Sequence, residues 1–221
     1  MPDIVPKLFM TGCDKNTEWM LPWFIKNYKK HVQVPSSIPL CVMDFGLTEK
    51  TKDWLQTQVY AVGNMSNIPN HIKGWFLKPM SMWKSPATST CWIDTDFEIR
   101  GDISSVFDHI VPGKLGMVED KPWSRRRGEK WHNSGIVAFT GKPKILAEWV
   151  SAVDRNPEVG DQEVLHGLLS PLQKEIYIHD LPNKYNFLRI QLLDGESDKQ
   201  ALAIHWTGFK GKNHIRSLMR K

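Results

Sequence analysis

The sequence predicts an α/β fold in which a central mixed β-sheet is flanked by helices. Over the first half of the chain, short apolar runs alternate with amphipathic stretches, the pattern of parallel strands joined by crossover helices. The second half combines strands with longer loops, so a mixed sheet fits better than a purely parallel one. The 221 residues can bury a sizeable core, and they contain no internal repeat and no linker long enough to separate two domains. We therefore expect one domain over residues 1–221.

The first half contains four predicted strands and three predicted helices. The strands are short apolar runs bounded by turn residues, at positions 7–10, 38–43, 59–62 and 90–93. The helices carry apolar side chains at a spacing of three and four residues, at positions 17–31, 48–58 and 75–84. Thr48 is a suitable N-cap for the second of these helices.

The second half adds four predicted strands and two predicted helices. The strands cover residues 114–118, 134–140, 176–178 and 201–204. The helices cover residues 143–154 and 161–169, and Pro143 stands near the start of the first, where its missing N–H costs least. The arginine run 125–127 is interpreted as part of a solvated loop.

The composition excludes several classes of protein. With 41% hydrophobic and 24% charged residues, the chain differs from a disordered one. No apolar run approaches the roughly 18 residues that a membrane span needs, and the N-terminus lacks the pattern of a secretory signal. Cys13, Cys41 and Cys91 are widely spaced in apolar surroundings, so we expect them to be small buried side chains in a reducing compartment. A cytoplasmic protein without a membrane span is therefore predicted.

The strongest local signal is Asp94-Thr95-Asp96, which directly follows the predicted strand 90–93. Open α/β sheets bind ligands at the carboxyl ends of their strands. Carboxylates are hard oxygen ligands that suit Mg²⁺ or Mn²⁺. Short motifs also occur by chance, so a pair of solvated turn aspartates is the alternative interpretation.

Three further motifs follow in order: Asn133-Ser134-Gly135 opening an apolar strand, Asp161-Gln162 at a helix start, and the segment 205–212 with the sequence HWTGFKGK. With the aspartate pair, they resemble the motif set of GT-A fold glycosyltransferases, and the last motif resembles an element of the glycogenin-like, retaining members. The chain also resembles the small transferase domain with which chlorella viruses glycosylate their capsid protein. The resemblance extends over roughly residues 7 to 215 and implies the Rossmann-like GT-A fold.

This resemblance implies a metal-dependent site. Asp94, Asp96 and His205 would hold one divalent ion, Mn²⁺ or Mg²⁺, because a cation stabilises the negative charge that develops on a leaving diphosphate. A core histidine is the alternative for His205, which ends an apolar run. The donor diphosphate would be bound by a flexible basic loop comprising Gly208, Lys210, Gly211 and Lys212. A basic tail without a binding role is the alternative for this loop.

Other residues are assigned to the donor by position in the implied fold. The nucleotide would contact Thr11, Gly12, Cys13, Asp14, Lys78 and Thr95. The sugar would contact Asn133, Ser134 and Gly135. A solvated helix lysine is the alternative interpretation of Lys78.

The catalytic candidates are Asp161 and Gln162, which resemble residues near the anomeric carbon on the face opposite the leaving group. A carboxylate or amide there can bind hydroxyls and stabilise an oxocarbenium-like centre. Asp161 also fits a helix N-cap. The acceptor would contact Glu119 and Asp120, which follow a strand end on the same side of the sheet.

The implied activity is transfer of a hexose, with retention, from a nucleotide diphosphate sugar to a hydroxyl of a glycan or glycoprotein. A UDP-sugar is the expected donor, and no nucleic-acid partner is expected. The activity would take place in the cytoplasm, or in the host cytoplasm for a viral protein.

Two other classes of function stay open. A phosphatase or phosphotransferase of the haloacid-dehalogenase type also uses an aspartate pair with Mg²⁺, but there the pair ends the first strand. A non-catalytic, basic, aromatic-rich module would bind carbohydrate or single-stranded nucleic acid by stacking. Against this module, several of the ten tryptophans fall at helical or buried-strand positions, where core packing accounts for them: Trp19, Trp23, Trp92 and Trp149.

The net charge of +5 belongs to one segment of the chain. Five basic residues and no acidic one lie between His205 and the C-terminus: Lys210, Lys212, Arg216, Arg220 and Lys221. The other basic residues balance the 24 acidic ones. This distribution favours local affinity for a polyanion such as a diphosphate over a basic surface for nucleic acid.

Overall fold

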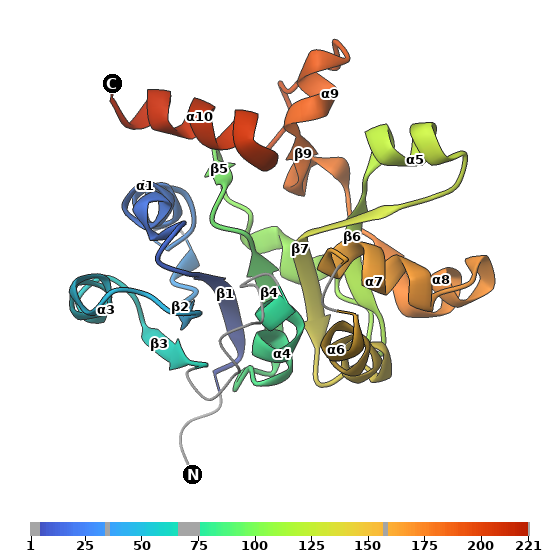
Figure 1. Ribbon diagram of the computed structural model, residues 1–221, viewed down its shortest axis with the longest axis horizontal. Coiled ribbons are helices and arrows are strands. Elements are labelled where there is room, and N and C mark those ends of the chain that lie inside the picture. The colour runs from blue at the N-terminus through green and yellow to red at the C-terminus, as the bar shows by residue number, and fades with distance from the viewer. Residues whose placement is uncertain (1–4, 34–35, 66–75, 157–158, 221) are drawn as a thin grey trace.

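A seven-stranded mixed sheet forms the centre of the computed structural model, which describes residues 5–33, 36–65, 76–156 and 159–220 (Figure 1). Across the sheet the strands are β3 (Ala61–Asn64), β2 (Leu40–Asp44), β1 (Lys7–Cys13), β4 (Ser89–Ile93), β7 (His132–Thr140), β6 (Leu115–Glu119) and β8 (Ile178–Asp180). Neighbouring strands pair in parallel except at β7, which runs antiparallel to both β4 and β6. The predicted mixed α/β fold is confirmed.

Helices cover both faces of this sheet, because successive residues of a strand point to opposite sides. Phe9 of β1 packs in one core with α1 (Leu21–Tyr28) and α3 (Glu49–Gln56). Its neighbour Leu8 packs in the other core, which is formed by α4 (Leu77–Trp83), α6 (Lys144–Arg155) and α7 (Asp161–Leu168). Short helical segments extend α1 at both ends, at Glu18–Met20 and Lys29–Gln33. Two others lie between strands, at Ser104–His109 and Asn183–Tyr185.

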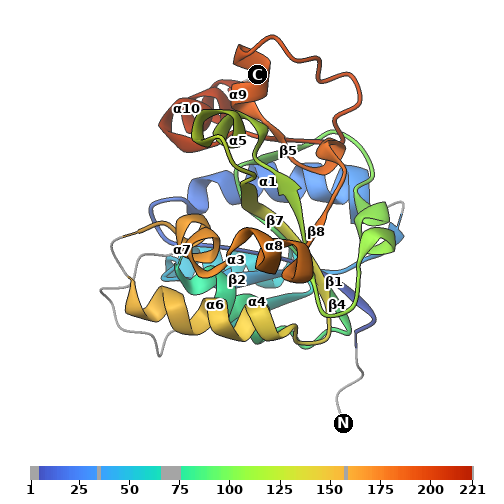
Figure 2. The same cartoon turned by 90° about the vertical axis from the view of Figure 1, so that its right-hand side faces the viewer.

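A second, three-stranded sheet stands beyond the carboxyl edge of the parallel strands. Its order is β5 (Phe97–Ile99), β10 (Ala203–His205) and β9 (Phe187–Leu188). α9 (Arg189–Leu193) and α10 (Gly208–Met219) lie beside it, and both views show them at the same end of the molecule (Figures 1 and 2). The chain passes from β4 into β5 through Asp94–Asp96, so the aspartate pair lies where the two sheets meet.

Most predicted elements are found with small shifts of their ends. The predicted strand 201–204 becomes β10, and the two short strands β5 and β9 and the short helix α9 were not predicted. The predicted helix 75–84 corresponds to α4, although position 75 lies outside the described residues. Strands of two or three residues are too short to show a hydrophobic period, which explains why β5 and β9 were missed.

The arginine run 125–127 is helical, so its interpretation as a loop is wrong. It forms the last turn of α5 (Lys121–Arg127), which begins with Asp120 as N-cap and Pro122 in the first turn. The Asp120 carboxylate accepts a hydrogen bond of 3.1 Å from the backbone N–H of Trp123. Gly128 ends the helix with a left-handed φ of 68°. These start and stop signals are present in the sequence.

The predicted strand 176–178 is also wrong in its first two residues. α8 (Pro171–Tyr177) extends to Tyr177, and β8 begins only at Ile178. Ser170 and Gln173 form a capping box at the start of this helix, with Pro171 at its first position. These residues favour a helix over a strand there.

The predicted burial of the three cysteines is confirmed. Cys13, Cys41 and Cys91 are free and buried, and burial raises the pKa of the Cys41 thiol to about 11. Trp92 and Trp149 lie in the core, while Trp19 and Trp23 are half-buried against it. Within the described ranges, no helix combines the length and apolar character required to cross a membrane.

The flexible loop predicted around Lys210, Gly211 and Lys212 is instead part of α10, so that prediction is wrong. Gly211 is buried against the backbone of Trp206, and a Cβ atom at position 211 would lie 2.0 Å from the Trp206 carbonyl oxygen. The glycine therefore allows α10 to approach the end of the second sheet.

Replacing Gly211 by alanine tests this close approach. We expect Gly211→Ala to lower the free energy of unfolding by about 1–3 kcal/mol, because backbone atoms must move to make room. Gly167→Ala is the matched control, since a Cβ atom in that position of α7 meets no described atom within 4 Å. There alanine is expected to raise the free energy of unfolding by about 0.5–1 kcal/mol. Urea denaturation measures both, and a Gly211→Ala protein as stable as the parent would contradict the packing argument.

Candidate functional site

A cavity of about 330 Å³ opens at the carboxyl edge of the central sheet. It is surrounded by residues from the ends of β1 and β4 and from the starts of β7 and α7. His205 of the second sheet and Lys212 of α10 complete its lining. Fourteen of the predicted site residues line it: Gly12, Cys13, Asp14, Lys78, Asp94, Thr95, Asp96, Asn133, Ser134, Gly135, Asp161, Gln162, His205 and Lys212. Residues far apart in the sequence are thus brought to one place.

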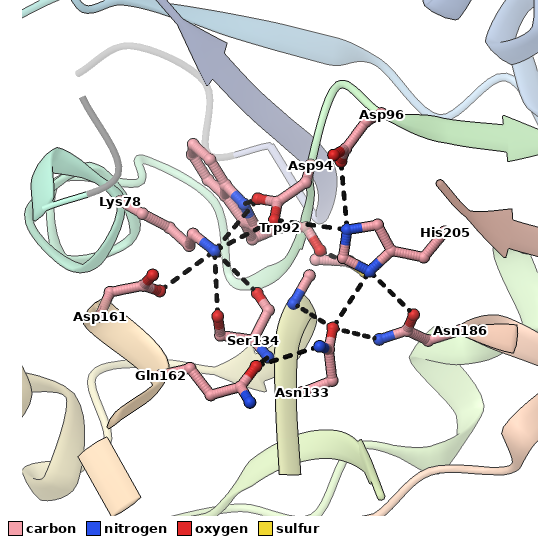
Figure 3. Close-up of polar contacts among 12 residues, drawn as sticks. Lys78, Trp92, Asp94, Asp96, Asn133, Ser134, Asp161, Gln162, Asn186 and His205 are labelled. Atoms are coloured by element: carbon pink, nitrogen blue, oxygen red, sulfur yellow. Dashed lines mark hydrogen bonds and ion pairs between the residues drawn. The ribbon is translucent and has the colours of Figure 1, made fainter. Parts of the chain in front are cut away.

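The three residues predicted to bind metal form a cluster in this cavity (Figure 3). Asp94, Asp96 and His205 each offer one ligand atom, and these atoms lie within 4.8 Å of one another. His205 Nε2 is 3.1 Å from an Asp96 carboxylate oxygen and 3.9 Å from one of Asp94. Two carboxylates and one imidazole suit Mn²⁺ or Mg²⁺, which leave further positions for diphosphate oxygens. The donor set therefore fits a divalent ion.

The two aspartates of the cluster differ in their electrostatic surroundings. Burial raises the pKa of Asp94, and the nearby Asp96 carboxylate adds to this effect, while Lys78 opposes it. Burial also acts on Asp96, but the adjacent His205 outweighs it and lowers the pKa of Asp96 below the usual range. Lys212 contributes in the same direction. Asp96 is thus held in its ionised form beside the imidazole.

Lys78 is a buried cation between two carboxylates. Its Nζ atom lies 3.1 Å from Asp94 Oδ1 and 3.1 Å from Asp161 Oδ2, and it donates to the carbonyl oxygen and hydroxyl of Ser134 (Figure 3). Burial alone would lower the pKa of Lys78, but Asp161 and Asp94 outweigh it and hold this pKa above the ordinary lysine value. The side chain is 5% exposed, so Lys78 is not a solvated helix lysine.

Asp161 and Gln162 stand at the start of α7, where Gly160 is the N-cap and Asp161 the first helical residue. The indole N–H of Trp149 donates to the Asp161 carbonyl oxygen at 2.9 Å, which ties this end of α7 to α6. The side-chain oxygen of Gln162 accepts hydrogen bonds from Asn133 Nδ2 at 3.0 Å and from the Ser134 backbone at 3.2 Å. The Gln162 oxygen is therefore already engaged by the start of β7.

Six predicted site residues do not line the described cavity. Thr11 is buried within β1, Gly208 and Lys210 are exposed on α10, and Gly211 packs against Trp206. Glu119 ends β6, and Asp120 caps α5 and accepts a hydrogen bond of 3.3 Å from Asn133 Nδ2. Lys210 and Lys212 separate because residues two positions apart point in different directions on a helix.

Five residues line the cavity without having been predicted there: Thr17, Met20, Phe45, Trp92 and Glu163. Trp92 donates its indole N–H to Asp94 at 2.7 Å. Its ring is stacked with that of Phe45, with centroids 6.2 Å apart and an interplanar angle of 11°. Phe45 directly follows β2, so its position at a strand end was a usable signal. Gly12 permits this arrangement, since a Cβ atom there would lie 2.6 Å from the Phe45 ring.

The charge pair at Lys78 can be tested by removing the cation. Lys78→Met leaves the half-buried Asp94 and the buried Asp161 without it, so the free energy of unfolding is expected to fall by about 3–5 kcal/mol at pH 7. Adding Asp161→Asn should restore part of the loss, because one uncompensated carboxylate is then neutral. Denaturation of the single and double variants measures the coupling. If the two substitutions were simply additive, Lys78 and Asp161 would not act as a pair.

The described structure resembles solved glycosyltransferases, whereas no protein-family model matches the sequence. The galactosyltransferase LgtC, solved with donor and acceptor sugar analogues, matches with a TM-score of 0.69 at 16% identity, over 91% of this chain and 87% of that one. A glycosyltransferase involved in glycosylation of the major capsid of PBCV-1 matches with a TM-score of 0.64 at 14% identity, over 98% and 100%.

GlyE of Streptococcus pneumoniae TIGR4 matches with a TM-score of 0.68 at 14% identity, and the match covers 92% of this chain but 55% of that protein. This chain therefore spans about half the length of GlyE. At these identities the comparison concerns the fold, and it agrees with the resemblance that the motifs carry. The chain has the GT-A fold of these glycosyltransferases.

Proposed function

We propose that the chain is a metal-dependent glycosyltransferase that moves a hexose from a nucleotide diphosphate sugar to an acceptor hydroxyl. The observation that carries this proposal is the cluster of Asp94, Asp96 and His205 in a cavity of the GT-A fold. A divalent ion bound there, Mn²⁺ or Mg²⁺, would neutralise the charge that develops on the departing diphosphate. Lys212, on the same cavity wall, would add a second positive group toward the phosphates.

The remaining walls of the cavity suggest how a donor would be bound. The ends of β1 and β2 provide Gly12, Asp14 and Phe45, which would accommodate the base and ribose. Asp161 and Gln162 would face the sugar, and Lys78 holds Asp161 in place. We propose a UDP-sugar as donor and retention as the outcome, on the basis of the motifs shared with retaining members of the fold.

The acceptor is proposed to be a glycan or glycoprotein. Two structural neighbours support it: one was solved with donor and acceptor sugar analogues, and another is involved in glycosylation of a viral capsid. Glu119 and Asp120 would lie on the acceptor side, where Asp120 also orders α5. The free, buried cysteines are consistent with a reducing compartment such as the cytoplasm, in the host for a viral protein.

The arrangement favours a transferase over a phosphatase of the haloacid-dehalogenase type. In that class the aspartate pair ends the first strand, whereas here it ends β4 and leads directly into β5 of a second sheet. The binding-module alternative also loses support, because Trp92 and Trp149 are core residues.

Thermal denaturation with a panel of nucleotide sugars tests the proposed donor and metal together. We expect a UDP-sugar to raise the melting temperature in the presence of Mn²⁺ and much less without it, because a ligand that binds only the folded state stabilises it. Asp96→Ala should abolish the Mn²⁺-dependent shift and transfer to an acceptor sugar.

Asp53→Ala, which removes an exposed carboxylate on α3 outside the cavity, is the matched control and should behave like the parent. Nuclear magnetic resonance of the product determines its anomeric configuration. Undiminished metal-dependent transfer by Asp96→Ala would contradict the metal assignment, and an inverted product would contradict the roles proposed for Asp161 and Gln162.

A further inference from the structure

Asn186 is a fully buried polar residue at the back of the proposed metal site (Figure 3). It lies directly before β9, in the second sheet, and no sequence motif pointed to it. Its amide oxygen is 3.2 Å from His205 Nδ1, and its amide nitrogen donates to the side-chain oxygen of Asn133 at 2.9 Å. Both polar ends of Asn186 are therefore used within the site.

Asn133 completes the contact with the imidazole. Its side-chain oxygen is 3.1 Å from His205 Nδ1 and also accepts from the Gly135 backbone at 2.9 Å. An amide oxygen can only accept a hydrogen bond, so Nδ1 must carry the proton that it shares with the two amides. Because Nδ1 carries this proton, the nitrogen available to bind a metal is Nε2, which lies 3.1 Å from Asp96.

Packing against Phe97 and Gly135 restrains the same ring. The ring of Phe97 stacks on the imidazole with centroids 4.2 Å apart and an interplanar angle of 23°. A Cβ atom added at Gly135 would lie 2.2 Å from His205 Cε1, so the backbone at Gly135 also packs closely against the ring. The imidazole is thus tightly packed, and the amides of Asn133 and Asn186 decide which nitrogen faces Asp96.

We infer that Asn186 is a positioning residue for metal binding, which holds His205 with Nδ1–H directed at the amide oxygens and Nε2 directed at the metal position. This inference rests on the proposed metal-dependent function. A partner on the second nitrogen of a ligating histidine orients the ring and raises its basicity, and loss of such a partner costs roughly 10–100-fold in metal affinity.

The contact network also links the metal position to Gln162. Asn133 uses its amide oxygen for His205 and Asn186 and its amide nitrogen for Gln162 and Asp120. Asn186 orients Asn133 through the bond between their side chains, so it also helps to hold Gln162 at the start of α7. One buried amide therefore contributes to the position of both a proposed metal ligand and a proposed catalytic residue.

Binding of Mn²⁺ alone, measured by electron paramagnetic resonance of the free ion, tests the inference without nucleotide sugar or acceptor. Asn186→Leu keeps the branching and the number of non-hydrogen atoms but has no acceptor for Nδ1–H and no donor to Asn133, and we expect it to weaken Mn²⁺ binding by roughly 10–100-fold. Asn186→Asp restores an acceptor oxygen, and we expect it to recover most of the affinity. Asn27→Leu, which removes an amide that donates to the Trp23 carbonyl oxygen in α1, is the matched control and should bind Mn²⁺ like the parent.

The melting temperature without metal shows whether each variant is folded, and Asn186→Ala replaces Asn186→Leu if the latter does not fold. A folded leucine or alanine variant that binds Mn²⁺ as tightly as the parent would overturn the inference and leave the proposed function intact. An equal loss in Asn186→Asp and Asn186→Leu would also overturn it, because an acceptor for Nδ1–H at this position would then make no difference to the affinity. Absence of Mn²⁺ binding by the parent protein would instead refute the proposed function, and the inference with it.

Discussion

The charge balance around Lys78 is the constraint on which the cavity depends. Three of the carboxylates that line the cavity are those of Asp94, Asp96 and Asp161, and the Lys78 ammonium is 3.1 Å from two of them. Buried like charges repel strongly unless a cation and hydrogen bonds compensate them. Lys78 satisfies this condition and is itself held by two oxygen atoms of Ser134. The third of these carboxylates, Asp96, lies 3.1 Å from His205 Nε2.

This charge arrangement exists only because two sheets meet at the aspartate pair. β4 brings Asp94 to the carboxyl edge of the central sheet, and the chain continues at once into β5 of the second sheet. β10 pairs antiparallel with β5, and His205 lies opposite Phe97 in that register. A shift of one residue would turn the His205 side chain to the other face of the strand. The small second sheet therefore positions His205 in the site. α10 packs against the end of this sheet through the close contact between Gly211 and Trp206.

Local patterns in the sequence predicted the elements up to β4 well and several of the later ones less well. Alternation of apolar runs and amphipathic stretches identifies β1, β2, β4 and the helices that cover them, because each has a clear hydrophobic period. Lys210 and Lys212 were interpreted as parts of a flexible loop because of Gly211, but this glycine serves the packing of a helix. The run Arg125–Arg127 was interpreted as a loop because of its charge, although Asp120, Pro122 and Gly128 mark a helix around it.

The sequence by itself determined the chemistry of the site: two carboxylates at a strand end, a late histidine, and an amide-rich strand start at Asn133. Each of these signals is local, and they were assigned to one site because together, in this order, they resemble the motif set of GT-A fold glycosyltransferases. Only the tertiary structure decided which side chains share the cavity, since Lys78, Asp161 and His205 come from separate elements. Asn186 had no local signal, because its role consists of hydrogen bonds to His205, 19 residues away, and to Asn133, 53 residues away. Burial makes those bonds necessary, and burial is a property of the folded chain.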